Sequence, residues 1–329
     1  MPPAAYRPHQ LQGQVFRGSH AIARGLLTEH QLRSHAWIRL SQDVYADAAL
    51  RRSHALQCLA VTLRLPIGAV IAGPSAACLH ATKHPDPLGT DTTDPGAGSV
   101  ADRHIPTGHD SFEAQGGEAT QPDARVHVIT PPTIRVPARR GLAVHVRQDS
   151  AYDITTVPVL GHPVPCTGVL QAAWDIALWL PPIAAVPVLD AMLHYQLLDT
   201  ADLAAICRNR TGIRGARRAR TAFAMTNPWS RSTLQSQLRV LLTEDGLPAP
   251  QLHCRIRPPF GGQPLLVDFA WPDLKVAVTY DADLVQMLRL IGWLGIYIPL
   301  DQPQLHAKLA ARVRATVYQR LALVRTHNG

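Results

Sequence analysis

The segment from Pro85 to Pro122 limits how this chain can fold more than any other feature. It is rich in Gly, Pro, Thr and Asp, and it has no periodic pattern of apolar residues. Such a composition cannot bury enough apolar surface to compensate for the entropy lost when the backbone becomes ordered. We therefore expect residues 85–122 to be a disordered acidic insertion in a loop, with packed cores built from the sequence on either side.

Charge is divided unevenly between this insertion and the rest of the chain. From Asp86 to Asp123 the sequence has eight acids and one base, Arg103, so this segment carries −7. Because the whole chain carries +8, the remainder carries +15. A basic body of this size favours a polyanionic partner, most simply nucleic acid, although a basic surface can also serve solubility alone.

The cysteines and apolar runs bear on the cellular compartment. The five cysteines are scattered and never form a CxxC pair, which argues against a disulfide framework or a zinc ribbon and favours a reducing cytoplasm. No apolar run reaches the roughly 18 residues of a membrane span, and the amino terminus shows no secretory signal. We expect a cytoplasmic protein that does not enter a membrane, and the sequence identifies no confident metal site.

Residues 1–50 are expected to form a unit of two short helices and a β-hairpin. Thr28 is a favourable N-cap, and Gln31 can complete a capping box, so we predict a helix from Thr28 to Ser34. The hairpin is predicted from Trp37–Leu40 and Val44–Ala46. This order of elements is the layout of a winged helix-turn-helix, whose second helix enters the major groove of DNA.

Five side chains of this unit are candidate DNA contacts. Gln31, Arg33 and His35 would face DNA from the second helix, and Arg39 near the hairpin would meet phosphate. Arg24, just before that helix, adds a further positive charge. A small helical cap with solvated arginines is the alternative interpretation of the same residues.

Residues 51–227 are expected to form a mixed α/β middle domain that contains the insertion. We predict helices within residues 52–82 and, after the insertion, strands at Arg125–Ile129 and Leu142–Val146 joined by a basic turn. Further helices are predicted at Thr167–Leu180, Pro182–Leu197 and Thr200–Arg208. The densest basic cluster follows, from Arg208 to Arg220. Arg217 and Arg218 are candidate DNA contacts there, and a solvated basic helix is the alternative.

Residues 228–329 are expected to form a compact α/β unit. A helix with Leu234, Leu238 and Leu242 on one face should precede three strands, a short helix, a fourth strand and a closing amphipathic helix. The strands are predicted around Gln251–Arg257, Leu265–Ala270, Leu274–Asp281 and Leu294–Ile298. Asp268 lies in the second strand among apolar neighbours, where a buried charge is costly unless a hydrogen bond, an ion pair or a metal ion compensates it.

The sequence RGSHAIARGLLTEHQLRSHAWIRLSQDVYAD, residues 17–47, resembles the amino-terminal winged helix of AbiEi-like proteins, the antitoxins of type IV toxin–antitoxin systems. The resemblance continues through SAACLH, RVHVIT and the helices after Cys166, and it covers most of residues 13–225. It rests on spaced apolar and Arg/Tyr positions and includes no catalytic signature. It implies a DNA-binding autorepressor, with double-stranded DNA and a cognate toxin protein as partners.

The carboxy-terminal unit resembles the very-short-patch-repair (Vsr) endonuclease-like domain, a branch of the PD-(D/E)XK nuclease fold. In such domains a helix Glu, a strand Asp and a Glu on the next strand gather around Mg²⁺. In the segment SRSTLQSQLRVLL, Gln235 occupies the position where such domains have the helix Glu. In the segment VDFAWPDLKVAVTYDADL, Asp268 occupies the position of the strand Asp. Thr279 takes the place of the second strand's acid, and Asp281 that of the following Asp. Because Gln and Thr bring no negative charge, the resemblance implies a nuclease site that has decayed.

The sequence thus predicts an α+β multidomain chain. Its parts are an N-terminal winged helix-turn-helix, a mixed α/β middle domain and a C-terminal restriction-endonuclease-like α/β domain. The expected function is that of a DNA-binding transcriptional regulator or antitoxin, without enzymatic activity or a cofactor. The alternative is a DNA-repair or defence endonuclease that cleaves phosphodiester bonds with Mg²⁺ through Asp268 and Asp281. A third interpretation is a protein-interaction module whose basic surface binds a toxin.

Overall fold

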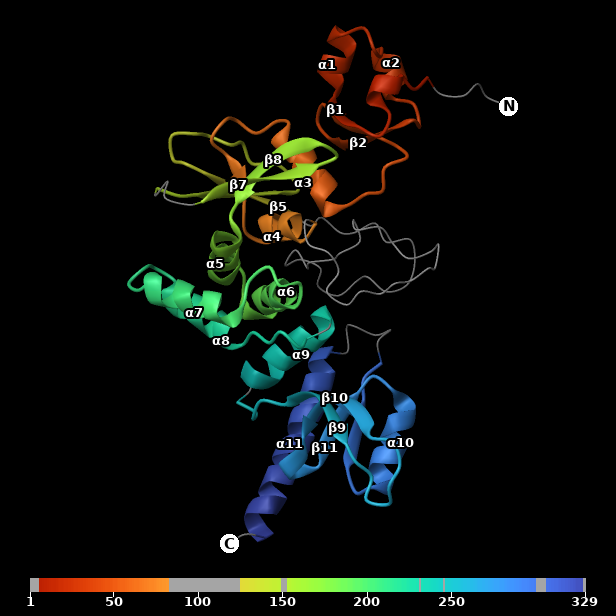
Figure 1. Cartoon of the computed structure of the whole chain (residues 1–329), viewed down its shortest axis with the longest axis vertical. Coiled ribbons are helices and arrows are strands. Elements are labelled where there is room, and N and C mark those ends of the chain that lie inside the picture. Colours follow the sequence, from red (N-terminus) through yellow and green to blue (C-terminus); the bar gives the residue numbers. More distant parts are fainter. Residues whose placement is uncertain are drawn as a thin grey trace, which may run out of the picture.

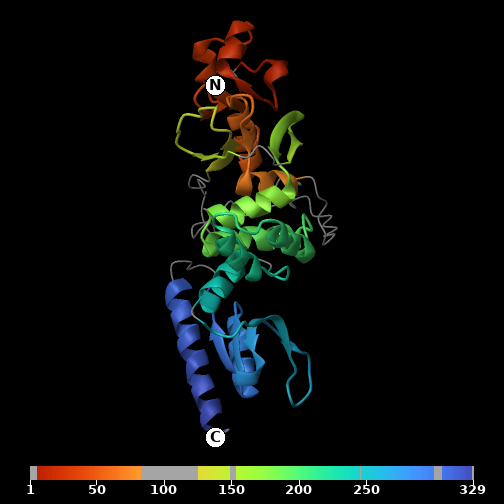
Figure 2. The same cartoon turned by 90° about the vertical axis from the view of Figure 1, so that its left-hand side faces the viewer.

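The structure is a computed structural model that describes residues 6–82, 125–148, 153–230, 232–244, 246–299 and 306–327. In these residues the strands form three separate sheets, which follow one another along the long axis of the molecule (Figure 1 and Figure 2). Helices lie beside and between the sheets, so the α+β class expected from the sequence is confirmed. The acidic insertion expected at residues 85–122 lies outside the described residues.

The N-terminal unit, residues 6–50, has a small antiparallel sheet in the order β1-β3-β2. Its elements are η1 (His9–Leu11), β1 (Val15–Arg17), α1 (Gly18–Ala23), α2 (Glu29–Leu32), β2 (Trp37–Ser41) and β3 (Val44–Asp47). The predicted capping box of α2 is confirmed. The Thr28 hydroxyl accepts the backbone N–H of Gln31, and the Gln31 side chain accepts that of Thr28. Leu32 and Trp37 belong to the buried core of this unit.

The middle sheet has the strand order β6-β5-β4-β8-β7. Its strands are β4 (Val70–Ile71), β5 (Val126–Thr130), β6 (Leu142–Val146), β7 (Ile154–Val159) and β8 (His162–Thr167). β5 and β6 lie where the sequence predicts strands, but they pair in parallel, so the segment between them crosses over and closes no hairpin. The β7–β8 hairpin is not predicted from the sequence, because Pro158, Pro163 and Pro165 interrupt the pattern that marks a strand.

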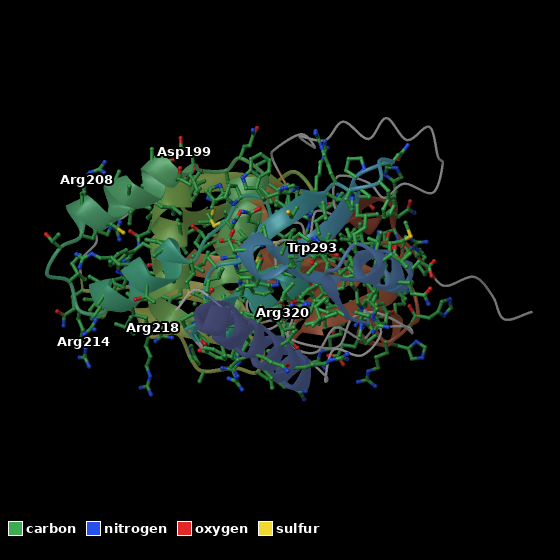
Figure 3. The ribbon with its side chains drawn as sticks, turned by 90° about the horizontal axis from the view of Figure 1, so that it is seen from below. Asp199, Arg208, Arg214, Arg218, Trp293 and Arg320 are labelled. Atoms are coloured by element: carbon green, nitrogen blue, oxygen red, sulfur yellow. The ribbon has the colours of Figure 1, made fainter. Side chains whose placement is uncertain are left out.

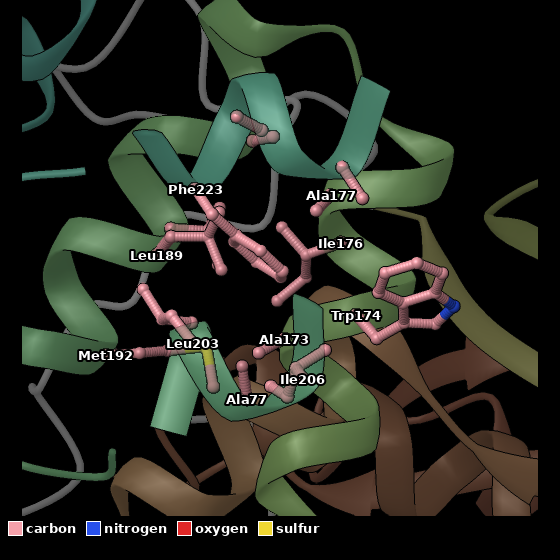
Figure 4. Close-up of a cluster of buried hydrophobic side chains, with 14 of the residues drawn as sticks. Ala77, Ala173, Trp174, Ile176, Ala177, Leu189, Met192, Leu203, Ile206 and Phe223 are labelled. Atoms are coloured by element: carbon pink, nitrogen blue, oxygen red, sulfur yellow. The ribbon is translucent and has the colours of Figure 1, made fainter. Parts of the chain in front are cut away.

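Helices pack on this sheet and beyond its end. They are α3 (His54–Thr62), α4 (Gly73–Ala81), α5 (Val169–Trp179), α6 (Pro182–His194), α7 (Thr200–Asn209) and α8 (Ala216–Ala224). A large buried cluster lies among α5 to α8 and includes Ile176, Leu189 and Phe223 (Figure 4). Gly73 begins α4 at a φ of +53°, and a Cβ at this position would lie 2.6 Å from the ring of Trp179. Glycine therefore permits the close approach of α4 to α5.

The C-terminal unit, residues 232–327, has a four-stranded sheet in the order β12-β11-β10-β9. Its elements are α9 (Thr233–Glu244), β9 (Gln251–Ile256), β10 (Leu265–Trp271), η3 (Pro272–Leu274), β11 (Val276–Thr279), α10 (Ala282–Leu290), β12 (Leu294–Tyr297) and α11 (His306–His327). β12 pairs in parallel with β11, and the other pairs are antiparallel. α9 and α11 share one core with Val276 and Val278, whereas α10 shares another with Ala277, so the helices cover opposite faces of the sheet.

A buried ion pair joins the middle helices to the C-terminal unit. Arg239 of α9 donates to the carboxylate of Asp190 on α6, and both side chains are almost fully buried. The same carboxylate accepts the Ser236 hydroxyl at 2.6 Å and the Asn227 backbone N–H at 2.7 Å. Burial raises the pKa of the Asp190 carboxyl, and the Arg239 charge and these hydrogen bonds oppose that rise. Loss of either charged partner would therefore leave the other one buried and uncompensated.

We predict that Arg239→Met destabilises the chain strongly. Breaking a buried ion pair by removing one partner costs about 3–5 kcal/mol, which urea denaturation would register as a lower unfolding midpoint. Arg239→Met combined with Asp190→Asn should recover part of this loss, because no buried charge remains. The matched control is Arg289→Met on an exposed position of α10. Equal midpoints for Arg239→Met and this control would contradict the role given to the pair.

Candidate functional site

Four of the five candidate DNA contacts in the N-terminal unit are exposed. These are Arg24, Arg33, His35 and Arg39. The fifth, Gln31, is partly buried, and its amide oxygen accepts the backbone N–H of Thr28 at 2.8 Å. Gln31 therefore holds the start of α2, and its amide NH2 is the group that remains for an outside acceptor.

The second helix of this unit is shorter than the sequence predicts. α2 ends at Leu32, because the backbone N–H of Arg33 bonds to the carbonyl of His30 at 3.1 Å and the chain turns there. Arg33 and His35 consequently lie in the connection between α2 and β2, because the helix ends two residues before the predicted end at Ser34. Their side chains are exposed in that connection.

The tip of the β2–β3 hairpin is tied to the start of α1 through Asp43. Its carboxylate accepts the Ser19 backbone N–H and hydroxyl, each at 2.7 Å, and the Arg17 guanidinium at 3.0 Å. Burial alone would raise the pKa of Asp43, but the hydrogen bonds from Ser19 and Arg17 bring it below its ordinary value. These contacts hold the hairpin, which carries Arg39, in a defined position beside α1.

A second group of exposed basic side chains, the arginine ridge, lies on and between α7 and α8. It consists of Arg208, Arg214, Arg217, Arg218 and Arg220. Figure 3 shows Arg208, Arg214 and Arg218 along one edge of the molecule. On α8, Arg217, Arg218 and Arg220 are exposed, whereas Ala219 and Phe223 of the same helix are buried. Arg210 departs from this pattern, since it donates to Gln171 at 2.7 Å and stacks over Trp174.

The predicted nuclease site, here called the Asp268 site, consists of Gln235 on α9, Asp268 on β10, Thr279 on β11 and Asp281 at the start of α10. Gln235 on α9 donates its side-chain NH2 to one carboxylate oxygen of Asp268 on β10, at 3.1 Å. The other oxygen of Asp268 accepts the backbone N–H of Tyr280 at 3.0 Å. Gln235 and Thr279 are buried, and Asp268 is half-buried. The structure therefore brings together Gln235, Asp268 and the end of β11.

Asp281 does not lie on the strand where the sequence placed it. β11 ends at Thr279, whose hydroxyl accepts the backbone N–H of Asp281 at 3.1 Å. Asp281 is the N-cap of α10, and its exposed carboxylate accepts the N–H of Asp283 at 2.9 Å. The predicted strand from Leu274 to Asp281 is therefore too long at its end, and Asp281 lies outside it. An aspartate directly after a strand is a favoured N-cap, and here the start of α10 uses it.

The donor set of the Asp268 site does not fit Mg²⁺. A magnesium site needs oxygen lone pairs, usually from one or two carboxylates with waters and substrate phosphate. Gln235 instead presents an N–H donor to Asp268, and Tyr280 presents another. Burial, and after it the nearby Asp268 charge, raises the pKa of the Tyr280 phenol, so that side chain offers no anion either. Across the described residues, no group of three or more His, Cys, Asp or Glu side chains could hold a metal ion.

One exposed group of residues is absent from the sequence predictions. Phe260 lies in the turn between β9 and β10, with Arg255 and Arg257 just before it, and Trp229 precedes α9. All four are exposed. Hydrophobic periodicity does not identify such a turn. The sequence does contain a signal for a basic surface here, because residues 246–267 contain no acid.

We predict that Gln235→Glu makes the chain less stable at neutral pH and makes its stability depend on Mg²⁺. Two carboxylates within hydrogen-bond distance repel each other, and a divalent cation relieves that repulsion. Thermal melting with and without Mg²⁺ would measure both effects. Gln237→Glu, two residues further along the same helix, is the control and should show neither. A Gln235→Glu melting temperature equal to wild type, with no response to Mg²⁺, would refute the assigned contact.

Comparison with known proteins gives distant relatives. No family model matches the chain. Two Mycobacterium tuberculosis proteins are similar to it, "Uncharacterized protein MT2308" of strain CDC 1551 / Oshkosh and "Uncharacterized protein Rv2248" of strain H37Rv. Each is 26% identical over 212 residues, which is 60% of this chain and 75% of the relative. Their names state no activity, so the function has to be argued from the residues themselves.

Proposed function

We propose that this chain is a DNA-binding transcriptional regulator or antitoxin of the AbiEi-like kind. The observation that carries the proposal is the N-terminal unit, in which a capped helix is followed by a hairpin and exposes Arg24, Arg33, His35 and Arg39. We interpret it as a winged helix-turn-helix, with the start of α2 in the major groove and Arg39 at phosphate. The arginine ridge, including Arg217 and Arg218, would add sequence-independent contacts to the DNA backbone.

In this proposal the C-terminal unit keeps a nuclease-like framework without nuclease activity. Its order of helix, three strands, helix, strand and helix agrees with the order predicted from the pattern of apolar residues. Its chemistry does not, because phosphodiester cleavage in such a fold depends on charge stabilisation by a metal held between carboxylates. Asp268 is hydrogen-bonded to a neutral amide, and Asp281 caps a helix.

A chain of this kind would act in the cytoplasm, with a cognate toxin protein as a second partner. In the part of the chain that the structure describes, no helix has the length and apolar character to cross a membrane. The rival proposal is a Mg²⁺-dependent endonuclease that acts through Asp268 and Asp281. It can be distinguished by experiment, because it requires the chain to cleave DNA.

We predict that Arg33→Ala with Arg39→Ala weakens duplex DNA binding and its dependence on salt. Each lost phosphate contact should lower the slope of log affinity against log salt by roughly one. Fluorescence anisotropy with a labelled duplex across a salt series would give both quantities. Arg289→Ala with Arg312→Ala, two exposed arginines of the C-terminal unit, removes the same charge elsewhere and should leave the slope near wild type. An unchanged slope in the Arg33/Arg39 variant would rule out the docking proposed.

We predict no cleavage of duplex, single-stranded or mismatched DNA by the purified chain with Mg²⁺ or Mn²⁺. Gel analysis of labelled substrates against a buffer control would detect it. Asp268→Ala should leave duplex affinity within about a factor of ten, or roughly 1.4 kcal/mol. Cleavage by wild type that disappears in Asp268→Ala would reverse the assignment and make the chain an endonuclease.

A further inference from the structure

The turn between β9 and β10 is a shaped projection at the edge of the C-terminal sheet. β9 is the outer strand, and its Arg255 pairs directly with Leu266 of β10. In Figure 2 the turn stands clear of the rest of the unit. Gly261 and Gly262 have φ values of +83° and +106°, and the N–H of Gly261 bonds to the carbonyl of Pro258 at 3.2 Å. The backbone of the turn is thus defined by glycines and a buried proline.

This turn presents aromatic and cationic groups together. The Phe260 side chain is 67% exposed, and Trp229 is 71% exposed. The backbone carbonyl of Trp229 accepts a hydrogen bond from His253 of β9 at 2.9 Å, so the Trp229 backbone is anchored beside the same strand. Arg255 is exposed on β9, and Arg257 is exposed directly after the end of that strand. With no acid from Gly246 to Val267, the local charge is wholly positive.

Exposed aromatic rings together with exposed arginines match the chemistry of single-stranded nucleic acid. Unpaired bases stack on aromatic side chains, and arginines neutralise the phosphates between them. A duplex offers few base faces for stacking, so this surface suits unpaired bases better than a helix. Leu266 and Asp268 are two residues apart on β10 and therefore lie on one face of the sheet.

We propose that the β9–β10 turn, with Trp229, binds single-stranded DNA through Phe260 stacking and through phosphate contacts of Arg255 and Arg257. The choice of DNA over RNA rests on the proposed function, in which the N-terminal unit of the same chain holds duplex DNA. The turn would then engage bases that are unpaired near the bound duplex. This is a second ligand surface, separate from the arginines of the N-terminal unit.

The test is fluorescence anisotropy of the full-length chain with a labelled oligothymidylate of about 15 nucleotides. Phe260→Ala should weaken binding about tenfold, and Phe260→Trp should restore it, because both rings stack on bases. Arg255→Ala with Arg257→Ala should lower the salt slope by about 1.4, or roughly 0.7 for each phosphate contact on a single strand. The matched control is Tyr297→Ala, which removes an exposed ring from the opposite edge strand β12 and should change nothing.

Two further arms separate this proposal from the proposed function. Arg33→Ala with Arg39→Ala should lose duplex affinity and keep affinity for the oligothymidylate, whereas Phe260→Ala should do the reverse. Oligothymidylate binding that is the same in wild type, Phe260→Ala and Tyr297→Ala would overturn the assignment of the turn. Tighter binding of a matched oligouridylate than of the oligothymidylate would overturn the choice of DNA.

Discussion

The buried pair of Arg239 and Asp190 links the C-terminal unit to the rest of the chain. Arg239 and Ser236 lie on the side of α9 that faces α6. The Asp190 carboxylate on α6 accepts hydrogen bonds from both side chains and from the Asn227 backbone N–H. Gln235, one turn before Arg239 on the same helix, donates to Asp268 on the C-terminal sheet. α9 therefore belongs to two packing interfaces at once. Because the pair is buried, its charges are satisfied in one arrangement only, and that requirement fixes how α9 lies between the two units.

The position of α9 also determines what the Asp268 site contains. With α9 held by Asp190, Gln235 points at Asp268, and a neutral amide fills the place that an acid would need. A carboxylate hydrogen-bonded to a side-chain amide and a backbone N–H is stable without a metal, which explains how Asp268 is accommodated in a mostly apolar strand. The same framework that would align a metal site thus supports a structural contact. We expect selection on this residue to act through folding more than through catalysis.

Local signals in the sequence predict many of the helices and strands, but they predict few of the contacts between residues far apart in the chain. The capping box at Thr28 and Gln31 involves neighbours along the chain, so it is readable from sequence and is present in the structure. The strands at β5 and β6 are readable from alternation, but their parallel pairing depends on distant chain segments. Arg239 and Asp190 are 49 residues apart, and nothing in either neighbourhood marks their partnership. Within the Asp268 site, the resemblance led us to expect Gln235 near Asp268, and the two side chains are in contact. Asp281 instead caps α10, although the pattern of apolar residues predicted a strand there.

The central claim is that the chain recognises a DNA sequence through its N-terminal unit. The most direct measurement is a gel shift with the DNA immediately upstream of its own gene and with a shuffled duplex of the same length and base composition. Specific DNA-binding proteins typically prefer their site by about a thousandfold or more over non-specific DNA. We predict at least about a hundredfold preference for the upstream DNA near 0.15 M salt, and we expect this preference to be lost in Arg33→Ala with Arg39→Ala. Equal affinity for the two duplexes would contradict it, because a basic surface alone would then explain all of the binding.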